Sequence, residues 1–327
     1  KEFVVDYGAG MIGGCCGTTP EHIKLLADAV SPLSPKPRPK SFAPHVASLY
    51  QAIPLDQDGT SPLYVGERTN ANGSKKFKEL LLLEDWTGIV EMAKEQEREG
   101  SHVLDVCTAY VGRDEVRDMT EVLSRLSTQV TLPIMIDSTQ LDVLEAGLKL
   151  LGGRAIINSI NLEDGEEKFD KIAVLARRFG AALVALTIDE DGMAKTAADK
   201  LRIAKRIHDL LTQRHGLPAS AIIFDPLTFT IASGDEDSRD AGQQTLEGIQ
   251  LIKKHLPGVR TILGLSNISF GLKPYARQTL NSVMLDEAIK CGLDAAILHA
   301  QKIIPVHQIA EEDLEIALDL IHNRRSE

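Results

Sequence analysis

The pattern of hydrophobic and polar positions repeats along most of the chain. Short continuous apolar runs have the length and the β-branched content of buried strands. Between them, apolar residues recur every three or four positions, which is typical of helices with one buried face. The expected strands are Leu63–Gly66, His102–Val106, Pro133–Asp137, Ala155–Asn158, Ala182–Ile188, Ile222–Asp225, Thr261–Leu265 and Ala295–Leu298.

Eight strands, each followed by a helical pattern over about 250 residues, predict an α/β fold of the (β/α)8 TIM barrel type. An open, doubly wound parallel sheet is the alternative, but such sheets seldom run to eight consecutive βα units. The last amphipathic stretch, Glu311–Arg325, is interpreted as the closing helix of the barrel. A lead into another module is the other interpretation of residues 309–327.

The residues before the barrel have a different sequence pattern. A strand at Phe3–Val5, a glycine-rich loop and a helix at Glu21–Val30 are expected. Because the chain opens without Met and inside an apolar run, we expect it to come from the middle of a longer protein. The prolines between Pro32 and Pro44 favour an extended tether. We therefore expect a domain remnant at 1–31, a linker at 32–58 outside the barrel core, and a barrel at 59–327.

Composition narrows the function. Hydrophobic residues make up 43% of the chain and aromatic residues 4%, so aliphatic side chains must fill a sizeable core. The net charge of −11 argues against a nucleic-acid partner, because phosphates need a basic surface. We find no apolar run long enough for a membrane span and expect no signal peptide. Four irregularly spaced cysteines predict a reducing, cytoplasmic location without a disulfide framework.

Polar side chains follow almost every expected strand. In a barrel these positions converge on the C-terminal face, where active sites are built. The alternative is that each Asp or Ser only caps the next helix. The residues are Glu67, Asp105, Asp137, Ser138, Asn158, Ser159, Asp189, Asp225, Ser266 and Asn267.

Several carboxylates without a glycine-rich phosphate loop suit a ligand that is rich in N–H donors. A 2-amino-4-oxopyrimidine ring is such a ligand, because its amino group and ring N–H can pair with one carboxylate. A divalent metal ion on the same carboxylates is the competing interpretation. The composition is compatible with either ligand, the ring with N–H donors or the metal ion.

Seven stretches resemble, in order and spacing, the pterin-binding domain of the cobalamin-dependent methionine synthases. Related methyltetrahydrofolate:corrinoid methyltransferases share much of this pattern. GGCCGTTPEHI at 13–23 resembles the end of the homocysteine-binding domain that precedes the pterin-binding domain in methionine synthases. The seven stretches are VGERTNANGSKKFKELL (65–81), HVLDV (102–106), PIMIDST (133–139), AIINSIN (155–161), IDEDG (188–192), IIFDPL (222–227) and GLSNISFGL (264–272).

This resemblance implies methyl transfer from 5-methyltetrahydrofolate to cob(I)alamin, the folate half-reaction of methionine synthesis from homocysteine. Cobalamin-binding and homocysteine-binding domains of the same polypeptide are the implied partners. The resemblance also assigns the residues. Asp137, Asn158 and Asp225 hold the pterin, Glu67 and Asn70 line the same mouth, Asp105 and Ser159 lie on the same rim, Asn267 lies near N5, and Ser269 and Arg277 form an outer network.

N5 of the folate is a poor leaving site, because the departing nitrogen would become an anion unless it is protonated or hydrogen-bonded. An asparagine has no useful pKa, so Asn267 is expected to position and stabilise N5. The proton is then expected to come through water or a carboxylate network.

The resemblance also makes Cys15 and Cys16 two of the three thiolate ligands of a zinc ion that activates homocysteine. The third ligand is expected upstream, so these residues alone should hold little or no zinc. Cys107 stands where the family more often has Asn and is interpreted as a buried thiol, and Cys291 as a core residue. His299 stands where a polar amide is common, and its role is left open.

Two other functions are compatible with the same fold. A dihydropteroate synthase would need a basic Ser-Arg-Lys run near the seventh strand, which we do not find. A folate carrier would bind the ligand and present it to a partner without chemistry. A methyl-transfer assay with free cob(I)alamin distinguishes these possibilities.

Overall fold

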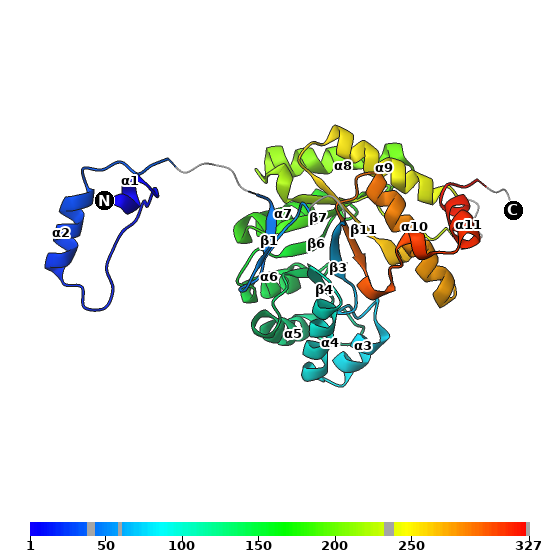
Figure 1. The fold of residues 1–327 in the computed structure, drawn as a ribbon, viewed down its shortest axis with the longest axis horizontal. Coiled ribbons are helices and arrows are strands. Elements are labelled where there is room, and N and C mark those ends of the chain that lie inside the picture. Colours follow the sequence, from blue (N-terminus) through cyan, green and yellow to red (C-terminus); the bar gives the residue numbers. More distant parts are fainter. Residues whose placement is uncertain (38–42, 58–60, 232–238, 325–327) are drawn as a thin grey trace. The chain divides into compact units, whose positions relative to one another are not determined.

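The computed structural model describes residues 1–37, 43–57, 61–231 and 239–324 (Figure 1). The chain divides into two compact units, Lys1–Ala43 and Pro44–Glu327. This boundary lies inside the predicted linker. Residues 38–42 and 58 of that linker are outside the described residues.

The described residues of the first unit form the helices α1 (Glu2–Val5) and α2 (Pro20–Val30). The strand predicted at Phe3–Val5 is wrong, because the amides of Val4 and Val5 both donate to the carbonyl of Lys1 in a helical turn. A strand this short needs a neighbouring strand, and the described residues of this unit contain none. Helix α2 confirms the predicted one and starts with Pro20, whose fixed φ suits a first helical turn.

The second unit is a closed parallel barrel. Its strands follow one another around the barrel in chain order, and the last one pairs with the first. The predicted barrel is confirmed, and the predicted strand ends are correct to within one or two residues. The strands are β3 (Leu63–Gly66), β4 (Val103–Val106), β5 (Ile134–Asp137), β6 (Ile156–Ile160), β7 (Ala182–Leu186), β10 (Ile222–Asp225), β11 (Arg260–Gly264) and β12 (Ala295–Leu298).

Helices surround the barrel, and a short hairpin of β8 (Ile188–Asp189) and β9 (Gly192–Met193) extends from β7. Helix α11 contacts α9 and α10, and its Ile321 is fully buried, as expected for the closing helix. The helices are α3 (Lys75–Leu82), α4 (Trp86–Arg98), α5 (Glu115–Gln129), α6 (Leu141–Leu150), α7 (Glu166–Phe179), α8 (Ala197–Asp209), α9 (Ala241–His255), α10 (Pro274–Lys290) and α11 (Glu311–Ile321).

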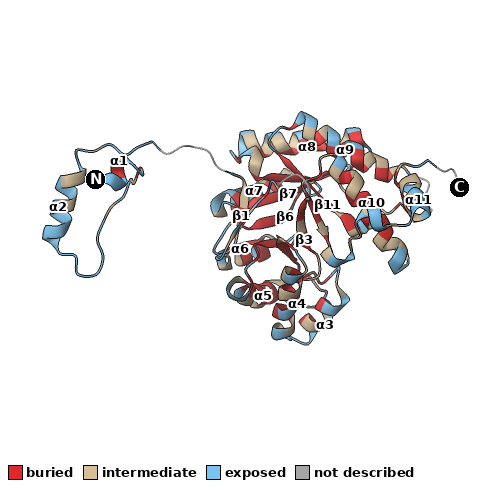
Figure 2. Cartoon of the chain, viewed as in Figure 1, coloured by how far each residue is buried: buried red, intermediate tan, exposed pale blue. Residues whose placement is uncertain are grey.

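Aliphatic side chains fill the barrel, as the sparse aromatic content predicts. Alternate strand residues such as Val65, Met135 and Ile156 form one cluster inside it. The intervening residues face the helices and join larger clusters with the apolar faces of the helices. The strands are accordingly buried along most of their length (Figure 2).

A hairpin from the predicted linker is part of this core. Strands β1 (His45–Ala47) and β2 (Ala52–Pro54) pair antiparallel, and Val46 and Leu55 are buried in the same cluster as the barrel interior. The prediction that residues 32–58 lie outside the barrel core is therefore wrong for this part. The physical reason is that the N-terminal end of the barrel exposes apolar side chains such as Leu63, and this hairpin covers them.

Two truncations test the corrected boundary. Removing residues 1–43 is expected to leave the unfolding midpoint of the barrel nearly unchanged, because they form a separate compact unit. Removing residues 1–58 also deletes Val46 and Leu55, each of which stabilises the fold by about 1.5–3 kcal/mol when fully buried. Urea unfolding followed by circular dichroism measures both. Equal stability of the two truncated chains would contradict this role of the hairpin.

Candidate functional site

An amide joins two carboxylates at the C-terminal end of the barrel. Asn70, which follows β3, donates from Nδ2 to Oδ2 of Asp105 and to Oδ2 of Asp137, both at 2.8 Å. Its Oδ1 accepts the backbone N–H groups of Asn72 at 2.9 Å and Gly73 at 3.2 Å. These bonds fix the orientation of the amide. The predicted convergence of strands β3, β4 and β5 is thus found in these three side chains.

The two acids are held in surroundings that disfavour their charge. Burial, followed by the charge of Asp137, raises the pKa of Asp105 well above its usual range. Burial also raises the pKa of Asp137 to about 6. In the described part of the chain, Oδ1 of Asp105 is buried without a hydrogen-bond partner. Such an acceptor is costly unless a ligand supplies a donor.

Strand β6 adds the next polar pair. Asn158 lies beside Asp137 in the register of the two strands, and its amide lowers the pKa of Asp105 in the same sense as Asn70 does. Ser159 follows through a cis peptide bond and is half-buried. The structure therefore groups Asn158 with the two acids and places Ser159 next to this group in the strand.

Asp225 ends strand β10 and is buried. Its Oδ1 accepts the backbone N–H of Leu227 at 2.8 Å. Burial raises its pKa to about 6, although the Leu227 amide, the charge of Lys200 and the Gly264 amide all lower it. Asp225 is thus an acceptor that is held in place, mostly ionised at neutral pH and protonated below about pH 6.

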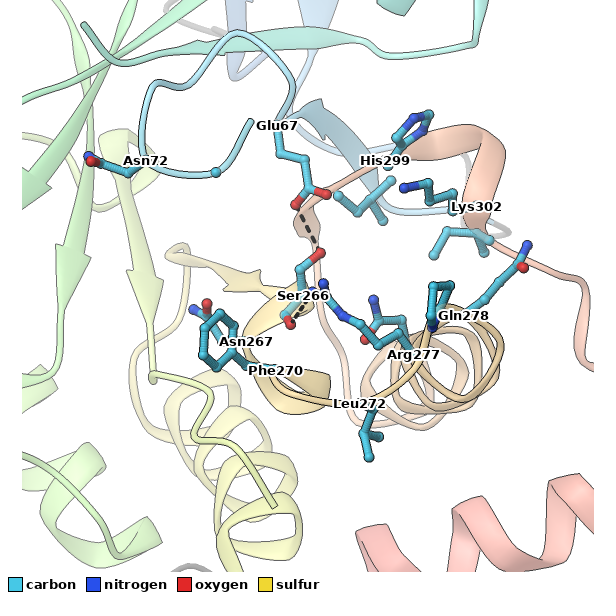
Figure 3. A pocket seen from close by; sticks show the side chains of 15 residues that line it. Glu67, Asn72, Ser266, Asn267, Phe270, Leu272, Arg277, Gln278, His299 and Lys302 are labelled. Atoms are coloured by element: carbon cyan, nitrogen blue, oxygen red, sulfur yellow. Dashed lines mark hydrogen bonds between the residues drawn. The ribbon is translucent and has the colours of Figure 1, made fainter. Parts of the chain in front are cut away.

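A cavity of about 530 Å³ opens at the ends of β3, β11 and β12 (Figure 3). Glu67 accepts a hydrogen bond from Oγ of Ser266 at 2.9 Å across it. Burial raises the pKa of Glu67, while Ser266, Arg277 and Lys302 lower it. The lining residues are Glu67, Asn72, Gly73, Ser266, Asn267, Phe270, Leu272, Pro274, Arg277, Gln278, Asn281, Leu298, His299, Lys302 and Ile303.

Asn267 is exposed to this cavity from the 3-10 turn η4 (Leu265–Ser269). Arg277, in the first turns of α10, donates to Oγ of Ser269 and to the carbonyl of Ser266, both at 3.2 Å. Thr230 donates to the carbonyl of Asn267 at 2.9 Å. Arg277 and Thr230 therefore both hold the turn that carries Asn267. Ser269 and Arg277 are hydrogen-bonded to each other, and their role toward N5 stays a prediction.

Two of the rim residues singled out in the sequence have structural partners instead. Asp189 is buried in the β8–β9 hairpin and pairs with Arg202 at 2.8 Å. Ser138 donates to Glu115 at 2.6 Å. For these two residues the structural alternative fits better than a ligand contact.

The residues whose role was left open can now be placed. His299 lines the cavity, and burial lowers its pKa. Cys107 is buried, as predicted, and hydrogen-bonds toward Asp137 while burial raises the pKa of its own thiol. Cys291, expected in the core, is half-buried at the end of α10 and packs against the edge of a core cluster. Lys302 was missed, because nothing in the sequence marks a lysine after the eighth strand.

Metal binding has little support in the residues that the structure describes. They contain no group of three or more His, Cys, Asp or Glu side chains that could hold a metal ion. Cys15 and Cys16 are both exposed and free. At the barrel rim, the amide nitrogen of Asn70 bonds the near oxygens of both Asp105 and Asp137, where a bridging cation would have to lie. This arrangement favours a ligand with N–H donors over a metal.

Comparison with known proteins places the chain in a family. The model of the pterin binding enzymes matches residues 66–299, which include every barrel strand except the first residues of β3. The chain belongs to the pterin-binding enzymes. Residues 1–30 separately match the model of the homocysteine S-methyltransferases.

Two curated relatives cover nearly the whole chain. Methionine synthase of Mycobacterium tuberculosis is 53% identical over 99% of the chain, and that of Mycobacterium leprae is 50% identical over 99%. The chain spans 27% and 28% of their respective lengths.

Solved structures show the same pterin-binding fold. A dihydropteroate synthase of Xanthomonas albilineans, in complex with indole-2-carboxylic acid and 6-chloroguanine, matches with a TM-score of 0.58 at 18% identity, over 79% of this chain and 93% of that one. The Yersinia pestis enzyme with a pterine-sulfa conjugate matches with a TM-score of 0.55 at 12% identity, over 86% of this chain and 100% of that one.

Among the described residues, no helix is both long and apolar enough to cross a membrane.

Proposed function

We propose that this pterin-binding barrel is the folate module of a methionine synthase and transfers the methyl group of 5-methyltetrahydrofolate to cob(I)alamin. The observation that carries the proposal is the set of acceptors at the C-terminal end of the barrel, formed by the buried Asp105 and Asp225 and the half-buried Asp137. The cavity that Asn267 lines opens at the ends of strands of the same barrel. The relatives of about 50% identity support the assignment to methionine synthase.

The acceptors suit the pterin ring. Its 2-amino group and ring N–H are donors that would satisfy the unpartnered Oδ1 of Asp105 and share the ionised carboxylates of Asp137 and Asp225. Asn158 supplies an amide that can both donate and accept. Ser159 is the neighbouring candidate at the same strand end. This set gives the ring one orientation, with N5 toward Asn267.

The cavity suits the rest of the substrate. 5-Methyltetrahydrofolate carries a p-aminobenzoyl group and an anionic glutamate. Phe270 and Leu272 offer apolar surface to the first, and Arg277 and Lys302 offer positive charge to the second. Glu67, fixed by Ser266, lines the same cavity, and its charge also raises the pKa of Asp105.

The chain's own residues then assist the departure of the methyl group. When the bond between N5 and the methyl carbon breaks, its electron pair stays on N5, which must receive a proton. The side chain of Asn267 holds N5 by a hydrogen bond as this charge develops, and Arg277 keeps the turn in place. Cobalamin, carried by another domain, supplies the nucleophile that accepts the methyl group. Water or the carboxylates at the rim supply the proton.

Residues 1–31 complete the proposal. We assign them to the end of a homocysteine-binding domain, with Cys15 and Cys16 as two of three zinc ligands. The pair lacks a third ligand among the described residues, so no step is assigned to zinc here. The homocysteine-binding and cobalamin-binding domains are the proposed partners, in the cytoplasm.

The test is methyl transfer from 5-methyltetrahydrofolate to free cob(I)alamin by the chain itself, followed by the absorbance of methylcobalamin. We expect transfer, and we expect Asp225→Ala to weaken folate binding by about 1–3 kcal/mol in calorimetric titration, because ring donors lose their partner. Exposed Glu163→Gln is the control. Tight folate binding without transfer would identify a carrier, and unchanged binding by Asp225→Ala would overturn the placement of the ring.

A further inference from the structure

A lysine is completely buried next to the proposed ring site. Lys200, in α8, has no exposed surface, and its ammonium group lies among the carbonyls of Ala194 at 3.0 Å, Pro226 and Leu227 at 3.5 Å. Its aliphatic stem runs against Gly248 of α9, where a Cβ would lie 2.7 Å from Cδ of the lysine. The groove between α8 and α9 is therefore shaped around this side chain.

The peptide group that Lys200 holds is the one that fixes Asp225. In a trans peptide, the carbonyl of one residue and the N–H of the next point in opposite directions. The carbonyl of Pro226 points at Lys200, so the N–H of Leu227 points the other way, where it donates to Oδ1 of Asp225 at 2.8 Å. Leu227 has a φ of 65°, in the left-handed region that non-glycine residues rarely adopt.

A purely structural role explains this lysine poorly. Burial of an ammonium group is unfavourable, and it lowers the pKa of Lys200 to about 8. A methionine would fill a similar volume without that penalty. What a methionine lacks is the charge and the donors that hold the carbonyls of Pro226 and Leu227 in the turn and that of Ala194. The contacts of Lys200 thus concern the conformation of residues 225–227 more than the filling of space.

We propose that Lys200 is a positioning residue for pterin recognition, which acts on the ligand through the Pro226–Leu227 peptide and the carboxylate of Asp225. The inference rests on the proposed function, because it takes Asp225 as a ring contact. Lys200 also contributes a positive charge that favours the ionised form of this carboxylate. It does not need to touch the ligand for either effect.

A double-mutant cycle tests the path through Asp225. Affinity for 5-methyltetrahydrofolate is measured by calorimetry for the full chain and for Lys200→Met, Asp225→Asn and the double variant. We expect Lys200→Met to weaken binding about tenfold, and to have less than about a twofold effect when Asp225 is already Asn. Lys253→Met is the matched control, because Lys253 pairs with Asp294 at the opposite end of the barrel. It should leave the affinity unchanged.

Two further measurements keep the proposal open to refutation if Lys200→Met folds poorly. Gly248→Ala keeps the lysine charge but displaces its stem, and is expected to weaken binding as well. NMR titration of the Asp225 carboxyl should show a higher pKa in Lys200→Met. Additive effects in the cycle, or unchanged affinity in both Lys200→Met and Gly248→Ala, would overturn the proposal. If Asp225→Asn itself binds normally, the placement of the ring is wrong instead.

Discussion

Replacing Asn267 by Ala is expected to lower the rate constant of methyl transfer by about 10²-fold, the usual effect of losing one well-placed transition-state hydrogen bond. Affinity for 5-methyltetrahydrofolate should change much less, because the carboxylates of Asp137 and Asp225 still hold the ring. Asn267 is exposed to the cavity, and its turn is held by hydrogen bonds that Arg277 and Thr230 donate to backbone carbonyls. Its side chain is thus free to follow the charge that develops on N5.

Stopped-flow transfer to cob(I)alamin and equilibrium binding, both on the same variant, separate the two effects. Gln278→Ala is a suitable control, because Gln278 also lines the cavity but has no proposed contact with N5. A fall of the rate and the affinity by the same factor would make Asn267 an ordinary binding residue. No change in either would remove it from the mechanism.

The barrel could be predicted because each strand carries its own signal. Ile222–Asp225, for example, is a run of apolar residues closed by an acid, and the structure gives the strand these same bounds. Parallel strands that are buried on both faces need such runs wherever they occur. The register and the closure of the sheet then follow from the number and spacing of the βα units.

The N-terminal part was less predictable, because its structure depends on contacts with distant residues. The described residues of its unit offer Phe3–Val5 no partner strand, and the backbone closes a helical turn instead. The hairpin around Val46 and Ile53 is short and lies among prolines, so its sequence resembles a linker. Only the open end of the barrel gives these apolar side chains a place to pack.

The candidate site was predicted as a set of residues but not as a network. The sequence singles out Asn70 and Asp105, but it does not reveal that one amide joins Asp105 to Asp137. Likewise, Asp189 has the same strand-end position as Asp225, yet a salt bridge with Arg202 removes it from the rim. Position in the chain selects candidates, and side-chain partners decide between them.

The buried acids also predict a conflict between ligand binding and stability. A carboxyl whose pKa is higher in the folded protein than in the unfolded chain stabilises the fold fully only when the pH is below its pKa in the unfolded chain. This contribution to stability is lost as the pH rises through its pKa in the folded protein. For Asp225 the two values are 3.8 and about 6, so the loss occurs between about pH 4 and pH 6 and amounts to about 3 kcal/mol.

Asp225→Asn, which stays neutral at every pH, is therefore expected to be more stable than the unsubstituted protein by about 3 kcal/mol at pH 8 and about half of that at pH 5. The ligand needs the ionised carboxylate, so the affinity of the unsubstituted protein should rise as the pH increases through about 6, and the variant should lack this rise. Urea unfolding at the two pH values measures the stability, and calorimetric titration with 5-methyltetrahydrofolate measures the affinity. If the stability difference between Asp225→Asn and the unsubstituted protein is the same at pH 5 and pH 8, the pKa of Asp225 is not raised by folding. The burial of Asp225 would then have no connection with the ligand.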